Sequence, residues 1–345
     1  MEREVKRPQL FGLDRNIFFT GLTSFLTDTS TKMIYCIMPL FLLSIGASKT
    51  MLSLIEGIAE STASLLKALS GFWSDKIGKN KPFMVIGYVV TAVITPVYAW
   101  VVNPFQVLYL RFIERVGKGI RTAPRDSLVA GSAEQGAVGK SFGFHKAMDN
   151  AGAITGPLLA YMLLHLLHLD YRQVFFWAGI PAILGVLCII FFVNEIKKAR
   201  ESLPAKIRLK DFPKRYYIFL AVTFLFTLGN STDALLLVKA RDVGIQVALI
   251  PLVYLVFNSV SVLFAIPLGA LSDRIGRGHL IVMVYLLYSI FYLGFVLAGD
   301  PIMIMVLFAL YGLYSAAIDG IQKAFVSDFL DSNKKCSGLG IYNSL

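Results

Sequence analysis

Apolar runs of about 20 residues follow one another along the whole chain, and they limit its fold more than any other feature. A helix needs about 20 apolar residues to cross the hydrocarbon core of a bilayer, which is roughly 30 Å thick. Apolar residues make up 56% of the chain and charged residues only 16%, whereas a soluble domain is about one quarter charged. No water-soluble fold can bury that much apolar surface, so the sequence predicts an all-α polytopic membrane protein.

The runs predict ten complete transmembrane helices and the start of an eleventh. The ten spans cover residues 16–46, 50–72, 82–102, 104–122, 141–167, 173–193, 216–240, 245–268, 279–298 and 301–325. The stretch 337–345 matches the beginning of the span at 141–167, so an eleventh helix begins there. Internal symmetry predicts that the rest of this helix and a twelfth would follow beyond the last residue.

The net charge of +11 is an orientation signal rather than a sign of nucleic-acid binding. Most of the 33 Lys and Arg residues lie in the N-terminal stretch, in every second connection and in the span ends beside these connections. Arg115, Lys118, Arg121 and Arg125, at the end of the fourth span, count among them. Basic residues concentrate on the cytoplasmic side of membrane proteins, so we expect a cytoplasmic N-terminus in the plasma membrane or a bacterial inner membrane.

One short loop sequence occurs twice and indicates that the chain is built from two similar halves. Residues 71–79 and 269–277 both read G-x-x-S-D-[KR]-I-G-[KR], and each copy joins one apolar run to the next. The glycines permit a tight turn and a close backbone approach. We therefore expect a six-helix bundle over residues 1–193, a basic cytoplasmic linker over 194–215 that lies along the membrane surface, and a second, truncated bundle over 216–345.

Charged residues inside the first two spans are the first candidates for a functional site. The first span carries Asp28 and Lys32, and the second carries Glu56 and Glu60. A charge inside the membrane costs a few kcal/mol, so it must face protein or a water-filled cavity. Because the two spans are antiparallel, their depths predict an ion pair between Lys32 and Glu56, with Asp28 and Glu60 below it. The alternative is a purely structural polar network between helices.

Further charged residues lie within spans of both halves. Arg111 and Glu114 lie in the fourth span, at i and i+3. Asp149 lies in the fifth span, Asp233 belongs to a polar patch in the seventh, and Asp319 lies in the tenth. We interpret these residues, with those of the first two spans, as candidates for substrate contact or proton coupling.

The sequence provides no pattern for an enzyme, a cofactor or a metal site. Cys36, Cys188 and Cys336 have no spacing typical of metal binding or of a disulfide framework. The stretch 137–141 ends like a phosphate-binding loop, but Glu134 stands where the first glycine of that loop is required. With no ATPase encoded, energy for transport would have to come from a gradient or a partner.

The duplicated loop, the basic linker and the two-half repeat resemble the major facilitator superfamily of secondary transporters. The stretch 115–126, Arg-Val-Gly-Lys-Gly-Ile-Arg-Thr-Ala-Pro-Arg-Asp, is similar to a prokaryotic branch of it whose substrates are largely uncharacterised. The resemblance implies twelve helices in two bundles around a central cavity, whereas this chain has ten complete spans. It also loosely relates Arg111 and Glu114 to a proton-coupling motif, although Arg115 stands where that motif prefers glycine.

The same resemblance implies a conformational latch and a helix kink. Asp273 would contact the start of the fifth span, and Asp75 the start of the eleventh, when the protein faces outward. The latch residues of the two loop copies are Gly71, Asp75, Lys76, Gly78, Gly269, Asp273, Arg274 and Gly276. Gly152, Gly156 and Pro157 partly match a motif of drug/proton antiporters, and the proline would kink its helix.

From these observations we expect a proton-coupled transporter that exports a small molecule by alternating access. It would act as a monomer in the lipid bilayer, with no metal, no cofactor and no nucleic-acid partner. Two alternatives stay open. One is an uncoupled facilitator, or a metal or siderophore exporter, of the same fold. The other is a membrane protein that does not transport, such as a sensor or a degenerate fragment.

Overall fold

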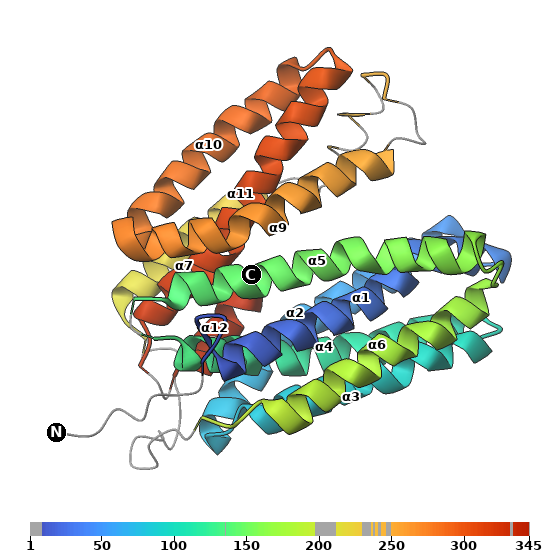
Figure 1. Cartoon of the computed structure of the whole chain (residues 1–345), viewed down its shortest axis with the longest axis horizontal. Helices are drawn as coiled ribbons and strands as arrows, with labels where there is room; N and C mark the ends of the chain where they lie inside the picture. Colours follow the sequence, from blue (N-terminus) through green and yellow to red (C-terminus); the bar gives the residue numbers. More distant parts are fainter. Residues whose placement is uncertain are drawn as a thin grey trace.

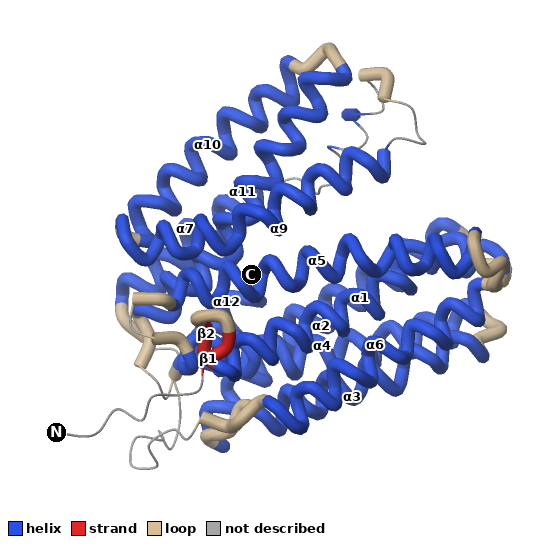
Figure 2. The backbone as a smooth tube through the Cα atoms, in the orientation of Figure 1, coloured by secondary structure: helices blue, strands red, loops and turns tan. Residues whose placement is uncertain are grey.

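The computed structural model describes residues 9–134, 136–196, 212–229, 236, 239–240, 243–245, 250–331 and 334–344, and nearly all of them are helical (Figure 1). A small hairpin, β1 (Gln9–Leu10) with β2 (Leu13–Asp14), precedes the first helix (Figure 2). The helices are α1 (Arg15–Ser44), α2 (Lys49–Ile77), α3 (Lys81–Val97), α4 (Pro104–Ser132), α5 (Val138–His165), α6 (Tyr171–Phe192), α7 (Lys214–Gly229), α9 (Ile250–Ile275), α10 (Arg277–Leu297), α11 (Pro301–Asp328) and α12 (Lys335–Ser344), with a 3-10 turn η1 (Tyr98–Trp100) after α3.

Five segments of the described part are long and apolar enough to cross a membrane. They are Lys81–Trp100, Tyr171–Phe192, Leu255–Ile275, Arg277–Leu297 and Pro301–Asp328. The all-α architecture predicted from the sequence is therefore confirmed. Length and composition alone do not confirm the predicted number of ten spans.

Short polar residues begin several helices and explain where the apolar runs separate. Asp14, Ser48, Asn103, Asp170 and Asp300 each accept a hydrogen bond from a backbone N–H in the first turn of the following helix. Such caps satisfy N–H groups that have no partner within the helix. These helices therefore begin at defined residues after short connections.

Two groups of helices meet along α5 and α9. In the first group, α1 packs on α5 and α6, α2 packs on α4, and α3 packs on α4 and α6; in the second, α11 packs on α9 and α10. The groups contact each other through α5 with α9, α12 with α2 and α11 with α5. Helices α5 and α9 approach each other at the end that carries the two loop copies and diverge toward the other end (Figure 1). We call the end with the loop copies the motif end.

The segment after α6 is attached to the motif end by a partly buried hydrogen-bond network. The Glu195 carboxylate accepts hydrogen bonds from the backbone N–H groups of Asn80, at 2.9 Å, and Lys81, at 2.8 Å. Asn16 and the backbone of Asn194 bond to each other in both directions. The start of the predicted linker is thus held against α1 and α3. Residues 197–211, where an amphipathic segment is predicted, lie outside the described residues.

Helix α4 is longer than predicted, and this corrects the interpretation of its basic residues. It continues to Ser132, through Pro124, whereas the predicted span ends at residue 122. Arg115 is 8% exposed and Arg121 is 6% exposed. Both count among the basic residues that signal membrane orientation in the sequence, but the structure buries them inside the protein. Hydropathy alone could not show this, because it does not say which face of a helix meets a cavity.

Gly152 and Gly156 let α5 pack closely on α1. A Cβ atom at Gly152 would lie 2.7 Å from the carbonyl oxygen of Phe25, and one at Gly156 would lie 2.6 Å from that of Thr29. Small residues at i and i+4 allow helix backbones to approach in this way. Pro157 follows within α5, which is assigned as one helix from Val138 to His165.

We expect Gly156→Ala to destabilise the protein by about 1–3 kcal/mol, because the added methyl group meets the α1 backbone, which cannot move aside without displacing the helix. Thermal unfolding in detergent measures the loss. Gly57→Ala is the matched control, since Gly57 lies within α2 and has nothing within 4 Å of an added Cβ. Equal melting temperatures for the two variants would contradict the close α1–α5 packing.

Candidate functional site

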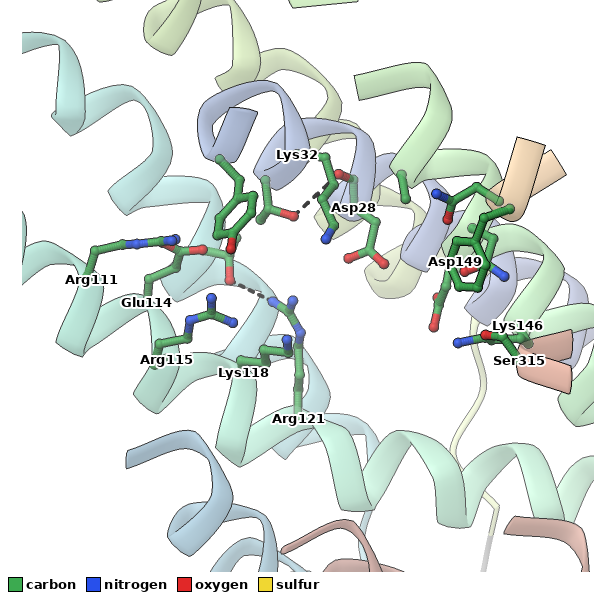
Figure 3. Close-up of a pocket in the computed structure, with 17 residues that line it drawn as sticks. Asp28, Lys32, Arg111, Glu114, Arg115, Lys118, Arg121, Lys146, Asp149 and Ser315 are labelled. Carbon is green, nitrogen blue, oxygen red and sulfur yellow. Dashed lines mark hydrogen bonds and ion pairs between the residues drawn. The ribbon is translucent and has the colours of Figure 1, made fainter. Parts of the chain in front are cut away.

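A cavity of about 360 Å³ lies between the two helix groups (Figure 3). Its walls come from α1, α3, α4, α5, α9 and α11, and most of the side chains that line it are polar or charged. The lining residues are Asp28, Thr31, Lys32, Tyr35, Thr91, Arg111, Glu114, Arg115, Lys118, Arg121, Lys146, Asp149, Asn150, Ala153, Phe257, Asn258 and Ser315.

The structure brings five of the predicted site residues together in this cavity: Asp28, Lys32, Arg111, Glu114 and Asp149. They come from three helices, so no stretch of sequence contains them all. In Figure 3, the α4 residues lie on one side, Asp149 on the other, and Asp28 between them. The site is thus formed by packing α1, α4 and α5 around one space.

The other predicted site residues fall elsewhere. Asp319 lines a second cavity and not this one. The side chains of Glu56 and Glu60, and all of Asp233, lie outside the described residues. The proposed Lys32–Glu56 ion pair therefore stays a prediction. The Lys32 ammonium lies 5.2 Å from the centre of the Tyr35 ring.

Arg111 and Glu114 form a buried pair at one end of the cavity. Arg111 is 2% exposed, and its Nη1 atom lies 3.2 Å from Oε2 of Glu114. The Tyr98 hydroxyl donates to the same carboxylate oxygen at 3.0 Å. The Arg111 guanidinium also lies 5.5 Å from the centre of the Tyr35 ring. Arg111 and Glu114, which the sequence places at i and i+3, thus form a buried ion pair, and the Tyr98 phenol adds a donor.

Asp28 and Asp149 differ in their partners. Nδ1 of His145 lies 3.5 Å from a carboxylate oxygen of Asp149, one helical turn away on α5. The Asp28 carboxylate has no hydrogen bond or ion pair with any residue in the described part of the chain. Among the described carboxylates that line this cavity, Asp28 is thus the one without a basic group within ion-pair distance.

Four lining cations were not among the predicted site residues: Arg115, Lys118, Arg121 and Lys146. Arg121 donates to Oγ1 of Thr91 at 2.6 Å and to a backbone carbonyl at 3.4 Å. Its guanidinium lies 4.3 Å from the centre of the Tyr88 ring. The signal that could have found the α4 cations is their spacing of three and four residues, which places them on one helix face.

A second cavity of about 390 Å³ adjoins the first toward the motif end. The two share Asp28, Lys118, Arg121 and Asp149 as lining residues. The second cavity is also lined by Lys67, Thr122, Arg125, Thr223, Thr227, Asp319, Gln322, Lys323, Tyr342 and Asn343. The shared residues form the boundary between the two spaces.

Polar contacts join the two helix groups around the second cavity. Lys146 on α5 lies 2.8 Å from Asp319 on α11. Asp126 on α4 accepts a hydrogen bond from Asn343 of α12 at 2.8 Å and lies 3.5 Å from Lys323 of α11. These contacts cross between the groups, and sequence reasoning missed Asp126, Lys146 and Asn343.

The aspartates of the two loop copies bind backbone N–H groups of the opposite group. Asp273 accepts from the N–H groups of Gly139 and Lys140, both at 2.9 Å, and from Arg277 at 2.7 Å. Asp75 accepts from the N–H of Ser337, at the start of α12, at 2.6 Å. The contacts of Asp273 and Asp75 thus involve the two helix starts that the resemblance implies. Arg277 also bonds to Asp328 and was not among the predicted latch residues.

The glycines of each loop copy have two separate roles. A Cβ atom at Gly269 would lie 2.3 Å from the carbonyl oxygen of Gly139, and one at Gly71 would lie 2.4 Å from that of Cys336. These glycines permit contact between the groups. Gly78 and Gly276 instead adopt φ angles of +73° and +94°, which side chains disfavour, so they make the turns. The basic residues Lys76 and Arg274 are exposed, in the last turns of α2 and α9.

The described residues contain no group of three or more His, Cys, Asp or Glu side chains placed to hold a metal ion. Cys36, Cys188 and Cys336 are all free thiols. The described side chains that line the two cavities can form ion pairs and hydrogen bonds, and their carboxylates can exchange protons.

Comparison with known proteins identifies the family. The model of the Major Facilitator Superfamily matches residues 20–345. The chain belongs to this superfamily of transporters. An uncharacterised MFS-type transporter of Methanocaldococcus jannaschii is 32% identical over 96% of this chain and 84% of its own length. The multi-drug resistance efflux pump PmrA of Streptococcus pneumoniae is 25% identical over 88% of this chain and 78% of its length.

Solved structures of the superfamily share the fold of this chain. The human organic anion transporter MFSD10 superposes with a TM-score of 0.73, over 96% of this chain and 89% of that one, at 17% identity. An identity this low bears on the fold alone. The fold and the family together make this a multi-pass membrane protein of a transporter family.

Proposed function

We propose that this protein is a proton-coupled secondary transporter that exports a small organic molecule by alternating access. The observation that carries the proposal is the charged cavity between the two helix groups. Hydrogen bonds between the groups at the motif end close this cavity on one side. Secondary transporters place their substrate site in this position, between two halves that rock about it. We further propose that the halves are residues 1–193 and 216–345, that residues 194–215 link them, and that the protein works as a monomer.

The membrane orientation follows from the same proposal. We place the motif end and the N-terminus on the cytoplasmic side, because basic residues such as Lys76, Lys79 and Arg274 gather there. The structure then represents an outward-facing state, with the Asp273 and Asp75 contacts closing the cytoplasmic side. The similarity to an efflux pump supports export, and the membrane would be the plasma membrane or a bacterial inner membrane.

Asp28 is the carboxylate that we propose as the proton carrier. Among the described acidic residues of the two cavities, Glu114, Asp149 and Asp319 each have a partner that can carry positive charge within 3.5 Å. Asp28 has none and faces the space shared by both cavities. A carboxylate that can be neutralised without breaking an ion pair loads and releases a proton at least cost.

Transport in inverted membrane vesicles tests the coupling. Export from the cell becomes uptake into such vesicles, and the probes would be labelled succinate, glycerol 3-phosphate and ethidium. We expect uptake of at least one probe above that of vesicles without the protein, driven by an acidic lumen. Nigericin in potassium medium should abolish it by collapsing the pH gradient. Uptake that survives nigericin would indicate an uncoupled facilitator and overturn the proposed coupling.

Asp28→Asn should reduce the rate of uptake driven by the pH gradient about 100-fold, because the amide cannot carry a proton. It should keep exchange of labelled for unlabelled probe, since exchange needs no net proton movement. Asp331→Asn is the matched control, because Asp331 is exposed between α11 and α12. If Asp28→Asn retains gradient-driven uptake, Asp28 is not the carrier.

A further inference from the structure

The basic residues of α4 form one continuous face along the helix. Their spacings of four, three, three and four residues keep them on one side of a helix with 3.6 residues per turn. At a rise of about 1.5 Å per residue, the face is about 21 Å long, most of the thickness of a bilayer core. The residues, referred to below as the α4 basic face, are Arg111, Arg115, Lys118, Arg121 and Arg125.

Every residue of the α4 basic face lines at least one of the two cavities, and two of these residues line both. Arg111 and Arg115 line the first cavity, Arg125 lines the second, and Lys118 and Arg121 line both. The face therefore runs from one space into the other without interruption. A ligand that moves between the two spaces stays beside these cations throughout.

Among the residues that the structure describes, the cavities are lined by more positive than negative side chains. The described lining of the first cavity contains six Lys and Arg side chains and three carboxylates. For the two cavities together, the described lining contains nine Lys and Arg side chains and four carboxylates. Asp126 lines neither cavity but balances part of this excess, because it lies 3.0 Å from Arg125 and 3.5 Å from Lys323. The remaining excess of positive side chains among the described residues gives the cavities a positive potential, which favours an anion as ligand.

Two of the four carboxylates, Glu114 and Asp319, have cationic partners at opposite ends of the two cavities, whereas Asp28 and Asp149 line the boundary that also contains Lys118 and Arg121. Glu114 is bound by Arg111 and Tyr98 at one end. Asp319 is bound by Lys146 at 2.8 Å and lies 3.8 Å from Lys323 at the other.

Between them, Arg121 is 6% exposed and contacts neutral groups: a threonine hydroxyl, a backbone carbonyl and a tyrosine ring. Its guanidinium retains donors for a planar anion, which arginine binds with two parallel hydrogen bonds.

We propose that the cavity selects a small organic anion that carries a carboxylate or a phosphate group, and that Arg121 and Lys118 bind this group. This rests on the proposed function of the same cavity as a transport site. Lys146, Asn150 and Asn258 on the opposite wall supply hydrogen bonds to the rest of the molecule. A volume of about 360 Å³ suits a molecule of metabolite size. Positive potential in such a cleft concentrates anions and repels cations.

Equilibrium binding to the purified protein in detergent tests the charge selection. The probes are matched pairs that differ in charge, namely succinate against succinamide and glycerol 3-phosphate against glycerol. We expect one or both anions to raise the melting temperature with dose, as a ligand of the native state does, and the neutral partners to leave it unchanged. The succinate arm identifies a carboxylate site and the glycerol 3-phosphate arm a phosphate site. Equal stabilisation by an anion and its neutral partner, or by neither, overturns the proposal.

Substitutions of Arg121 test the location. We expect Arg121→Gln to weaken binding of the stabilising anion by about tenfold or more, since it loses charge-assisted hydrogen bonds. Arg121→Lys should be intermediate, because it keeps the charge but not the two-pronged geometry. Arg215→Gln is the matched control, since Arg215 is exposed at the start of α7. Unchanged affinity in Arg121→Gln overturns the assignment.

A second substitution guards against a folding defect. If Arg121→Gln does not fold, Lys118→Gln measures the same site, and it should also weaken anion binding while leaving glycerol and succinamide without effect. Unchanged anion affinity in Lys118→Gln overturns the assignment as well. The binding assay needs neither a membrane nor a pH gradient. Anion binding without gradient-driven uptake would therefore refute the proton coupling alone, and uptake of ethidium without anion binding would refute the charge selection alone.

Discussion

Glu114→Ala should lower the free energy of unfolding by about 3–5 kcal/mol, one of the two largest effects that we expect from a single substitution. The Glu114 carboxylate lies 3.2 Å from Arg111, which is 2% exposed, and also accepts from the Tyr98 hydroxyl. Removing one member of a buried ion pair leaves the other charge in a poorly solvating site, which costs several kcal/mol. Unfolding in mixed detergent with increasing dodecyl sulfate measures the loss.

A pair of further variants separates the charge effect from simple loss of packing. Glu114→Gln keeps acceptor and donor atoms at the site, so we expect a smaller loss of about 1–2 kcal/mol. Arg111→Leu combined with Glu114→Leu removes both charges and should recover much of the stability lost in Glu114→Ala. A double variant that is less stable than Glu114→Ala would show that the pair itself, rather than charge balance, stabilises this region.

Asp273→Asn should shift the conformational equilibrium about 10- to 100-fold away from the state in which the motif end is closed. Asp273 accepts two backbone hydrogen bonds from the start of α5 and one from Arg277. Hydrogen bonds to a charged group contribute about 1.5–3 kcal/mol each, and an amide accepts them more weakly. Since the closed and open states differ in these contacts, the loss of stabilisation appears as a population shift.

Spin labels at Ala137 and Ile275, which lie at the motif ends of α5 and α9, report this shift as a distance distribution. The labels are introduced after the three native cysteines are replaced. We expect the longer distance to gain population in Asp273→Asn. Asp300→Asn is the matched control, because Asp300 also accepts a backbone N–H, at the start of α11, but does not join the two groups. An unchanged distribution in Asp273→Asn would remove its role as a latch.

Local patterns in the sequence were sufficient for the helical architecture and for the loop copies. A run of about 20 apolar residues must become a membrane helix because backbone groups in lipid need internal hydrogen bonds. Gly78 and Gly276 make turns because glycine has no side chain and so adopts positive φ angles, which a single residue in the sequence is enough to predict. Asp28, Lys32, Arg111, Glu114 and Asp149 stood out because a charge inside an apolar run is expensive wherever it lies.

The role of the α4 basic face became visible only in the tertiary structure. In the sequence, Arg115, Lys118 and Arg121 belong to a basic stretch after an apolar run, which is also how a solvated cytoplasmic flank looks. The packing of α4 against α2 and α3 decides that all three line a cavity and that Arg115 and Arg121 are buried. Depth from sequence position likewise predicted a partner for Lys32, but it cannot fix the rotation of a helix about its own axis.

What the sequence determined by itself is therefore the all-α membrane architecture, the glycine turns of the two loop copies, and the charged residues whose place inside apolar runs costs free energy. The tertiary structure decided which of those residues share a cavity and which contacts close it, as for Asp126 with Asn343 and Asp75 with Ser337. The physical reason is that the propensity to form a helix, and the free-energy cost of a charge within an apolar run, both depend on residues close by in the sequence. Partners separated by more than 200 residues are chosen only when helices pack, because packing sets both their rotation and their distance.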